Sequence, residues 1–400
     1  MITFAIVLVT YNRPQLLRYA LESLATQSYR EFTVHVVDNG SDPPVDLDVL
    51  PGGMDLTLTR FTTNQHPSDA GEAAIRHVLA HHRDSHFLLL ADDDALSPNA
   101  LAVAAALFER YPELESLGVG FTHFDHDQKV CLAADADLGS FSGELRRFEA
   151  QRLALSLCSY WGIGPILEGR TPRLAHPSAS FLSLDLLRRT QAVQGEICIR
   201  PLGDVGYVGC CFHTEAVGYL DLPLVVLGKT AVREMNGVQA GGRAYWKRRE
   251  GPWMEYTPLK GSSFVNIAVE SHLKVLHRNG IDRRWDCSLR PDFFFRHLMQ
   301  VLEDDPETEE TRADAAEAAP LLVESLVRAG QLAPTCDRQK AAVSVVEYLR
   351  AAAAEARRAR LAGQHQERAP EGRRFADIVA CAAWQDRALA MPLLKRSANV

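Results

Sequence analysis

Short apolar runs alternate with amphipathic stretches through the first third of the chain. The apolar runs, rich in Val, Ile, Leu, Thr or Phe, predict strands at 2–9, 33–37, 56–61 and 86–91. The stretches that separate or follow them carry apolar residues at helical spacing and predict helices at 14–27, 69–82 and 98–111. This alternation is typical of a Rossmann-like α/β fold, a mostly parallel central sheet flanked by helices, in which ligands bind beyond the carboxyl ends of the strands.

The pattern changes twice further along the chain. After about residue 120 the strand and helix signals become mixed, and residues 231–260 are rich in Gly and aromatic residues, which predicts a loop or lid. From 261 to 400 the pattern is almost entirely helical. We therefore expect a first domain over 1–230, with halves at about 1–120 and 121–230, then the loop, then a C-terminal mainly helical region.

The composition is that of an ordinary globular protein, since 46% of the 400 residues are hydrophobic and 24% are charged. A formal net charge of -8 argues against general nucleic-acid binding, which usually needs a basic surface. The first apolar run has no basic segment ahead of it and predicts a strand rather than a signal peptide. No run approaches the roughly 20 apolar residues that span a bilayer. We therefore expect no transmembrane segment, and any membrane contact would be peripheral, at the inner face.

The eight cysteines form no CxxC pair, and Cys210 and Cys211 are adjacent, which suits neither zinc spacing nor a disulfide framework. Buried thiols in a reducing cytoplasm are the simplest expectation. Charges crowd two parts of the helical region, an acidic connector at 303–310 and arginines at 357–374. These are either solvated helix faces or a patch that faces an acceptor, a partner or a membrane. A homo-oligomer formed through the C-terminal helices is left open.

Three consecutive acids, Asp92, Asp93 and Asp94, follow directly on the predicted strand at 86–91. Like charges this close repel one another, and burying them is costly unless a cation or strong donors compensate. The cluster therefore predicts a divalent cation, Mg²⁺ or Mn²⁺, that bridges phosphates; the alternative is a solvated turn. Polar turns also end two other predicted strands, at 10–13 and 38–42, and three such turns in one crevice favour a nucleotide site.

Three segments, in this order and at this spacing, resemble the inverting GT-A glycosyltransferases of family 2. They are Val7-Leu8-Val9-Thr10-Tyr11-Asn12-Arg13, Val36-Val37-Asp38-Asn39-Gly40-Ser41-Asp42 and Leu88-Leu89-Leu90-Ala91-Asp92-Asp93-Asp94. The resemblance covers about residues 1–230 and leaves the C-terminal helical part outside it. It implies a GT-A catalytic domain whose first half holds a nucleoside-diphosphate sugar and whose second half holds the acceptor.

The resemblance also implies roles for individual residues. The nucleotide-sugar contacts expected from it are Thr10, Tyr11, Arg13, Asp38, Asn64, Gly71, Arg76, Asp92 and Asp93. Asp38 would hold the base, although an Asx turn that stabilises its own loop is a compatible role. Asp92 and Asp94 match the DxD motif and would hold Mn²⁺ or Mg²⁺, which stabilises charge on the departing nucleoside diphosphate.

The general base that the resemblance implies is Asp204, in Arg200-Pro201-Leu202-Gly203-Asp204-Val205. Gly203 replaces the acid that usually precedes it in the family. The alternative is a helix cap, which would stabilise the free N–H groups of the next helix by about 1 kcal/mol. Many relatives place a metal-binding His about two dozen residues further on, where this chain has Lys229. Protonated Lys229 cannot ligate a metal but can neutralise phosphate, and His176 and His213 are alternative ligands.

Aromatic residues are the candidates for acceptor binding, because apolar sugar faces stack on aromatic rings. Trp161, Trp246 and Trp253 are the expected contacts, with packing of the helical region as the alternative role. The aromatic segment that contains Trp246, together with the triple Asp, also resembles bacterial galactofuranosyltransferases, although too loosely to name the sugar. A UDP-sugar is the favoured donor, and carbohydrate, lipid-linked and small-molecule acceptors are all compatible with the sequence.

Two other functions are compatible with parts of the pattern. A sugar-phosphate nucleotidyltransferase shares the superfold, but it would normally carry a Gly-rich basic loop after the first strand, where this chain has only Tyr11-Asn12-Arg13. The other is a non-catalytic module, built from the helical tail, that binds sugar nucleotides or serves as a scaffold. Pyrophosphate release would favour the first of these, and donor binding without turnover would favour the second.

Overall fold

The protein folds into two compact units, seen here in a computed structural model. The structure describes residues 1–46, 53–83, 85–132, 138–164, 176–230, 254–260, 263–281, 289–304, 308–364 and 372–397. The first unit contains Met1–Leu153, Thr171–Ala231 and Ala369–Val400, and the second contains Ala154–Arg170 and Val232–Arg368. Among the described residues, no helix has the length and apolar character needed to cross a membrane.

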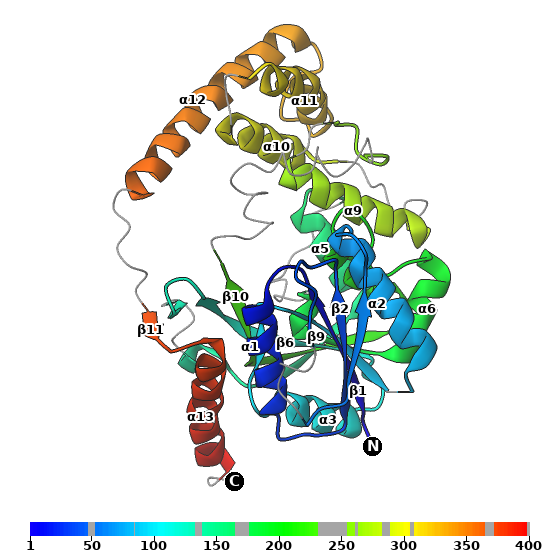
Figure 1. Ribbon diagram of the computed structural model, residues 1–400. Helices are drawn as coiled ribbons and strands as arrows, with labels where there is room; N and C mark the ends of the chain where they lie inside the picture. The colour runs from blue at the N-terminus through cyan, green and yellow to red at the C-terminus, as the bar shows by residue number, and fades with distance from the viewer. Residues whose placement is uncertain are drawn as a thin grey trace. The chain divides into compact units, whose positions relative to one another are not determined.

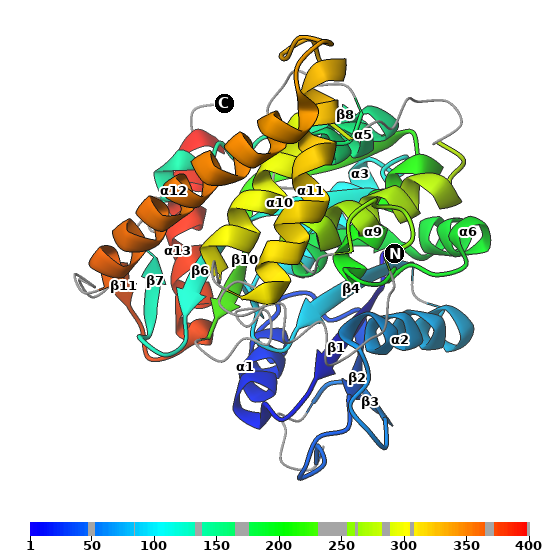
Figure 2. The same cartoon turned by 90° about the horizontal axis from the view of Figure 1, so that it is seen from above.

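Four parallel strands form the part of the first unit that carries the strand-end motifs. They are β1 (Phe4–Thr10), β2 (Phe32–Asp38), β3 (Leu56–Arg60) and β4 (His86–Ala91), arranged in the order β4-β1-β2-β3. Strands β1 and β2 are labelled in Figure 1, and all four are labelled in Figure 2. The register pairs Thr10 with Asp38, and Asp38 with Arg60, so the strands end together. We call this line of strand ends, with Ala91 on β4, the carboxyl edge. The predicted α/β fold with a mostly parallel sheet is confirmed.

The remaining strands extend the sheet beyond β4. They are β5 (Ala95–Leu96), β6 (Ser116–Asp125), β7 (Val130–Leu132), β8 (Leu145–Glu149), β9 (Ser180–Ser183), β10 (Ala216–Lys229) and β11 (Gly372–Arg374). Because β9 is antiparallel to both β4 and β6, those two strands run in the same direction, and β10 runs parallel to β6. Lys229 at the end of β10 pairs with Asp125 at the end of β6, so both residues also lie at the carboxyl edge.

Helices cover both faces of this sheet, which explains the uninterrupted apolar runs of the strands. The helices and 3-10 turns of the first unit are α1 (Pro14–Ala25), α2 (Pro67–His81), α3 (Ala100–Arg110), η2 (Leu138–Ser140), η3 (Pro177–Ala179), α6 (Leu184–Gln194), η4 (Gly203–Val205), α7 (Gly206–Cys210), η5 (Cys211–His213) and α13 (Ile378–Ser397); α5 (Ala150–Tyr160) begins in this unit and continues into the second. Ile6 and Leu8 of β1 pack with Leu17 of α1, whereas Ala5 and Val7 pack with Ile75 of α2. Alternate side chains of β1 thus belong to two hydrophobic cores. Helices α1 and α2 lie on opposite sides of β1 (Figure 2).

The end of the chain returns to the first unit. Strand β11 pairs with β7, and α13 packs beside β10. Gln385 of α13 is fully buried and accepts from the hydroxyl of Thr122 at 2.7 Å, while its amide donates to the hydroxyl of Ser97 at 3.0 Å and to the carbonyl of Pro223. One amide therefore joins β6, β10 and the turn after β5.

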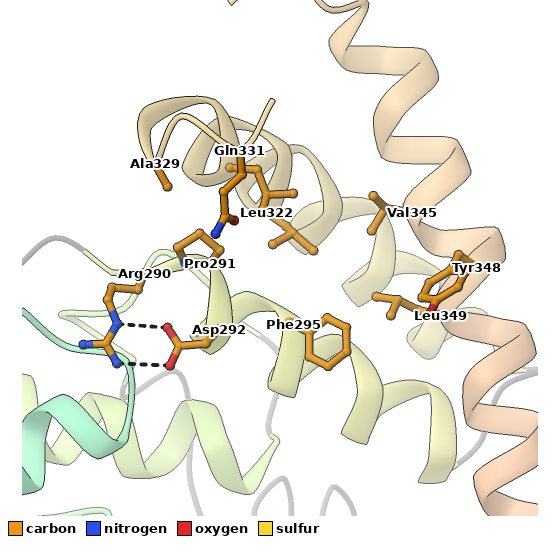
Figure 3. A pocket seen from close by; sticks show the side chains of 11 residues that line it. Arg290, Pro291, Asp292, Phe295, Leu322, Ala329, Gln331, Val345, Tyr348 and Leu349 are labelled. Atoms are coloured by element: carbon orange, nitrogen blue, oxygen red, sulfur yellow. Dashed lines mark hydrogen bonds and ion pairs between the residues drawn. The ribbon is translucent and has the colours of Figure 1, made fainter. Parts of the chain in front are cut away.

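The second unit is helical in its described part. It contains α9 (Phe264–Arg278), α10 (Pro291–Asp304), α11 (Glu309–Arg328) and α12 (Arg338–Gln364). Helices α10, α11 and α12 surround a cavity of about 650 Å³ whose lining is mostly apolar. Figure 3 shows Arg290 paired with Asp292 on one side of this cavity and Phe295 and Tyr348 on the other.

Two histidines of the parallel strands are buried in the neutral form. Burial lowers the pKa of His35 to about 4, with a further contribution from His77, whose ring stacks on it at 4.0 Å. Burial alone lowers the pKa of His86 to about 4. The unfolded chain would take up these protons near pH 6.5, well before the folded chain does.

We therefore predict that the free energy of unfolding falls as the pH is lowered from about 6.5 to about 4, by about 1.4 kcal/mol per pH unit for each buried histidine. The His86→Gln variant, which can keep the hydrogen bond to Ser85, should show a shallower fall than the wild type. Urea denaturation across that pH range measures the difference. Equal slopes for the two proteins would contradict the assignment.

Candidate functional site

The three acids that follow β4 are all buried at the carboxyl edge. Asp92, Asp93 and Asp94 are 4%, 6% and 2% exposed. The hydroxyl of Thr10, the last residue of β1, donates to Asp92 at 2.7 Å. The guanidinium of Arg13 lies 3.2 Å from the carboxylate of Asp92 and 3.9 Å from that of Asp93. The structure thus brings together Thr10, Arg13 and the first two acids.

The acids of this cluster act on one another electrostatically. Burial and the neighbouring Asp93 raise the pKa of Asp92 to about 6, against the opposing effect of Arg13 and Thr10. Asp92 and Asp93 share the guanidinium of Arg13, and Asp94 follows directly on them. Buried negative charge of this kind attracts a cation, and hard carboxylate oxygens suit Mg²⁺ or Mn²⁺.

Asp94 contacts the end of β10. Its carboxylate accepts a hydrogen bond of 2.8 Å from the backbone N–H of Gly228. The carbonyl of Asp93 accepts from Nε2 of His126 at 2.8 Å, which fixes the tautomer of that ring. A Cβ on Gly228 would lie 1.8 Å from the carbonyl oxygen of Asp93, so only glycine fits. The next residue, Lys229, therefore begins beside the acid cluster.

These residues fit a substrate-shared metal better than a metal cage. Among the described residues, no group of three His, Cys, Asp or Glu side chains is arranged to hold a metal ion. Mg²⁺ commonly binds through one or two carboxylates and takes its other ligands from substrate phosphates and water. Asp92 and Asp94 would supply that pair of carboxylates.

The two histidines considered as further ligands lie at different ends of the sheet. His213 precedes β10 and so lies at the end opposite to the acids, with the 14-residue strand between it and the acid cluster. The structure therefore does not bring it to the cluster. His176 lies two residues before Ser178, whose hydroxyl accepts from the N–H of Ala91, so it is at the carboxyl edge. His126, to which no sequence motif pointed, contacts the acid segment directly.

Asp38 anchors the turn after β2. It is fully buried, and its carboxylate accepts from the N–H groups of Ser41 and Val45 at 2.9 and 3.0 Å and from Nε of Arg60 at 3.1 Å. Burial favours the neutral acid, but the bonds from Ser41, Val45 and Arg60 outweigh it and leave the pKa of Asp38 below its usual value. The Asx-turn role is present in the structure, and contact with a base stays a prediction.

The turn after β2 is joined to both of its neighbours. Ser41 accepts from the N–H of Asn12, and Asn12 in turn accepts from the N–H of Asp42 at 2.8 Å. Asn39 donates to the side chain of Asn64 and accepts from the N–H of Gln65. Asn39 was not among the predicted residues, although its place between Asp38 and Gly40 in the quoted motif was a usable signal.

Gly71 and Arg76 have structural partners on α2. A Cβ on Gly71 would lie 3.0 Å from the sulfur of Cys198, so the glycine makes room for that side chain. Arg76 donates to Glu72 at 2.8 Å and to the carbonyl of Gly195 at 2.7 Å. It also lies nine residues into α2, about 14 Å along the axis from the end of the helix at the carboxyl edge. Their contacts with diphosphate or sugar stay predictions.

The candidate base lies on η4, beside the first turn of α2. A Cβ on Gly203 would lie 3.1 Å from the hydroxyl of Ser68, which places the backbone of Asp204 at the helix N-terminus. Its side chain is outside the described residues, as are Trp246 and Trp253. Trp161 packs edge to face on Phe264, with ring centroids 5.9 Å apart, so packing within the second unit is one role that it has.

The close approach at Gly228 gives a direct test of this geometry. We predict that Gly228→Ala destabilises the protein by about 2–3 kcal/mol or more, because the added methyl must displace the backbone of Asp93. Gly218→Ala, on the same strand, meets only the movable side chains of Leu114 and Leu117 and should cost under about 1 kcal/mol. Chemical denaturation measures both, and equal effects would contradict the tight junction.

Comparisons with known proteins agree with the fold. Residues 5–134 match the family described as Glycosyl transferase family 2. No curated protein matches the chain. Among solved structures, the chain is similar to TarS from S. aureus, residues 1–349 in complex with UDP-GlcNAc, with a TM-score of 0.51 and 16% identity over 91% of this chain and 92% of that one. The same TarS segment in complex with UDP gives a TM-score of 0.43 and 14% identity, over 84% of this chain and 73% of that one.

At 16% identity the likeness to TarS shows the fold alone. The family match is independent of it and spans the strand-end motifs from β1 to β7. Thr10, Asp38 and Asp92 lie within the matched segment. Residues 5–134, about a third of the chain, are therefore similar to family 2 glycosyltransferases, and the likeness to TarS supports the expected fold of a central sheet flanked by helices.

Proposed function

We propose that the protein transfers a sugar from a nucleoside-diphosphate sugar, preferably a UDP-sugar, to an acceptor hydroxyl with inversion at the anomeric carbon. The observation that carries this proposal is the meeting of Thr10, Arg13 and the buried Asp92 at the carboxyl edge, beside the Asp38 turn. The preference for a UDP-sugar draws on the TarS segment in complex with UDP-GlcNAc, whose fold this chain resembles. The acceptor is a carbohydrate, a lipid-linked group or a small molecule.

Two cationic side chains, those of Arg13 and Lys229, would bind the diphosphate. Arg13 already lies against Asp92, and Lys229 follows the glycine that binds Asp94, so both cations start from the carboxyl edge. Asp92 and Asp94 would hold a divalent metal between them and the phosphates. A bound Mg²⁺ or Mn²⁺ would stabilise the negative charge that develops on the leaving nucleoside diphosphate. The Asp38 turn would shape the place of the base.

Asp204 is proposed as the general base. Inversion requires removal of the proton from the acceptor hydroxyl on the face of the sugar opposite to the leaving group. The support for this role is the position of η4 beside the start of α2, at the same edge as the acids but on another segment. A carboxylate there can remove the proton without competing for the metal.

Binding of nucleotides tests the donor assignment. We predict that UDP with Mn²⁺ or Mg²⁺ raises the melting temperature by roughly 5 °C at about 100 times its Kd, more than GDP or dTDP does. EDTA should remove most of the shift, and Asp94→Ala should remove its metal dependence. Thermal shift and calorimetry provide the measurement. No shift with any of the three nucleotides, with or without metal, would contradict the proposal.

A turnover assay tests the base. We predict that Asp204→Asn lowers kcat for UDP release from the sugar nucleotide chosen by binding by about 100- to 10,000-fold and leaves the Kd of UDP unchanged. Asp185→Asn, which breaks an exposed ion pair with Arg188 on α6, should turn over like the wild type. Full turnover by Asp204→Asn would remove Asp204 as the base. Pyrophosphate release from UTP would instead favour a nucleotidyltransferase.

A further inference from the structure

The segment that carries Asp204 is bound to α2 along its length. We call residues 197–206 the base loop. The backbone N–H groups of Ile197 and Cys198, which open the loop, both donate to one oxygen of Glu72, at 2.6 and 3.0 Å. Glu72 is 7% exposed, so its carboxylate is largely shielded from water. Hydrogen bonds to a charged, buried acceptor are the strong ones.

The other oxygen of Glu72 is also engaged. It accepts from Nε of Arg76 at 2.8 Å and from the amide of Gln191 on α6 at 3.1 Å. Arg76 continues to the carbonyl of Gly195, the C-cap of α6. The carboxylate of Glu72 therefore accepts hydrogen bonds from the base loop, from α2 and from α6. These bonds fix the position of the base loop relative to both helices.

Further contacts follow the base loop toward Asp204. Arg200 forms a two-pronged ion pair with Asp69 in the first turn of α2. Gly203 lies against Ser68, and Gly71 leaves room for Cys198. A Cβ on Gly206 would lie 1.4 Å from the carbonyl oxygen of Ile197, so the two ends of the loop touch.

We propose that Glu72 is a positioning residue for catalysis: by binding the start of the base loop it sets the place of Asp204 relative to the acceptor hydroxyl. The proposal rests on the role of Asp204 given above. It explains why α2 carries Asp69, Gly71 and Glu72 on the side that meets the loop, and it assigns this helix to proton removal. Arg76 contributes through Glu72.

The expected effect follows from the chemistry of the clamp. Gln in place of Glu72 has the same shape but a single acceptor oxygen, so it cannot serve the two loop N–H groups and the Arg76 and Gln191 donors together. Buried N–H groups that lose their acceptor cost free energy, and the loop relaxes to recover partners. A misplacement of about 1 Å at a reacting group can lower the rate by about 100-fold.

The test is a double-mutant cycle between Glu72→Gln and Asp204→Asn, read as UDP release from the sugar nucleotide selected by binding. Glu72→Gln alone should lower kcat by about 10- to 100-fold and leave the Kd of UDP unchanged. In the Asp204→Asn background the same change should have little further effect, because Glu72 acts through Asp204. If the double variant shows the product of the two single-variant losses in kcat, the proposal is overturned. Full turnover by Asp204→Asn alone would instead remove the proposed base.

A second readout follows the base loop without turnover. Cys198 is 4% exposed, and release of its backbone from Glu72 should speed its alkylation by iodoacetamide, measured on the peptide by mass spectrometry. Asp185→Asn is the matched control and should leave both alkylation and turnover unchanged. If Glu72→Gln fails to fold, Asp69→Asn, which removes a half-exposed partner of the same loop, enters the same cycle. Unchanged alkylation together with unchanged kcat would overturn the proposal.

Discussion

The burial of three adjacent carboxylates at the end of β4 is the constraint on which the site depends. Each acid needs a partner, and the partners come from two other parts of the sheet: Thr10 and Arg13 from the end of β1 and the turn that follows it, and Gly228 from the end of β10. Those partners still leave Asp92 with a raised pKa. Burial of this negative charge lowers the stability of the fold, and binding of a cation or a cationic complex would offset that loss.

The sequence was sufficient to predict the part of the site that depends on parallel strands. Strands with uninterrupted apolar runs must be covered on both faces, and parallel strands with similar lengths end at one edge. That reasoning placed Thr10, Asp38 and Asp92 together, and the register confirms that they end neighbouring strands. The quoted motifs added which side chains to choose. Neither argument required knowledge of contacts between distant segments.

The rest depends on contacts that leave no local pattern. Residues 145–149 lie where the strand and helix signals are mixed, and they form β8 because they pair with β10, a partner that lies about seventy residues further along. The resemblance to the family predicted ligand contacts for Gly71 and Arg76. In the structure their partners are Cys198 and Gly195, which come from another segment of the chain. His126 contacts Asp93 through a ring nitrogen and a carbonyl, and no spacing rule predicts such a bond.

The last helix shows how far such dependence extends. The amide of Gln385 donates to Ser97, three residues after Asp94, and to Pro223, five residues before Gly228. It therefore binds both of the segments that meet where Gly228 donates to Asp94. That amide is fully buried, and its bonds to a hydroxyl and a carbonyl hold the two segments at a fixed separation. The chain leaves the first unit after β10 and returns as β11 and α13 to complete the support of the same strands. The segments that flank the acid cluster near residue 93 are therefore joined by a residue almost three hundred positions later, which is why α13 belongs to the first unit and not to the helical second unit.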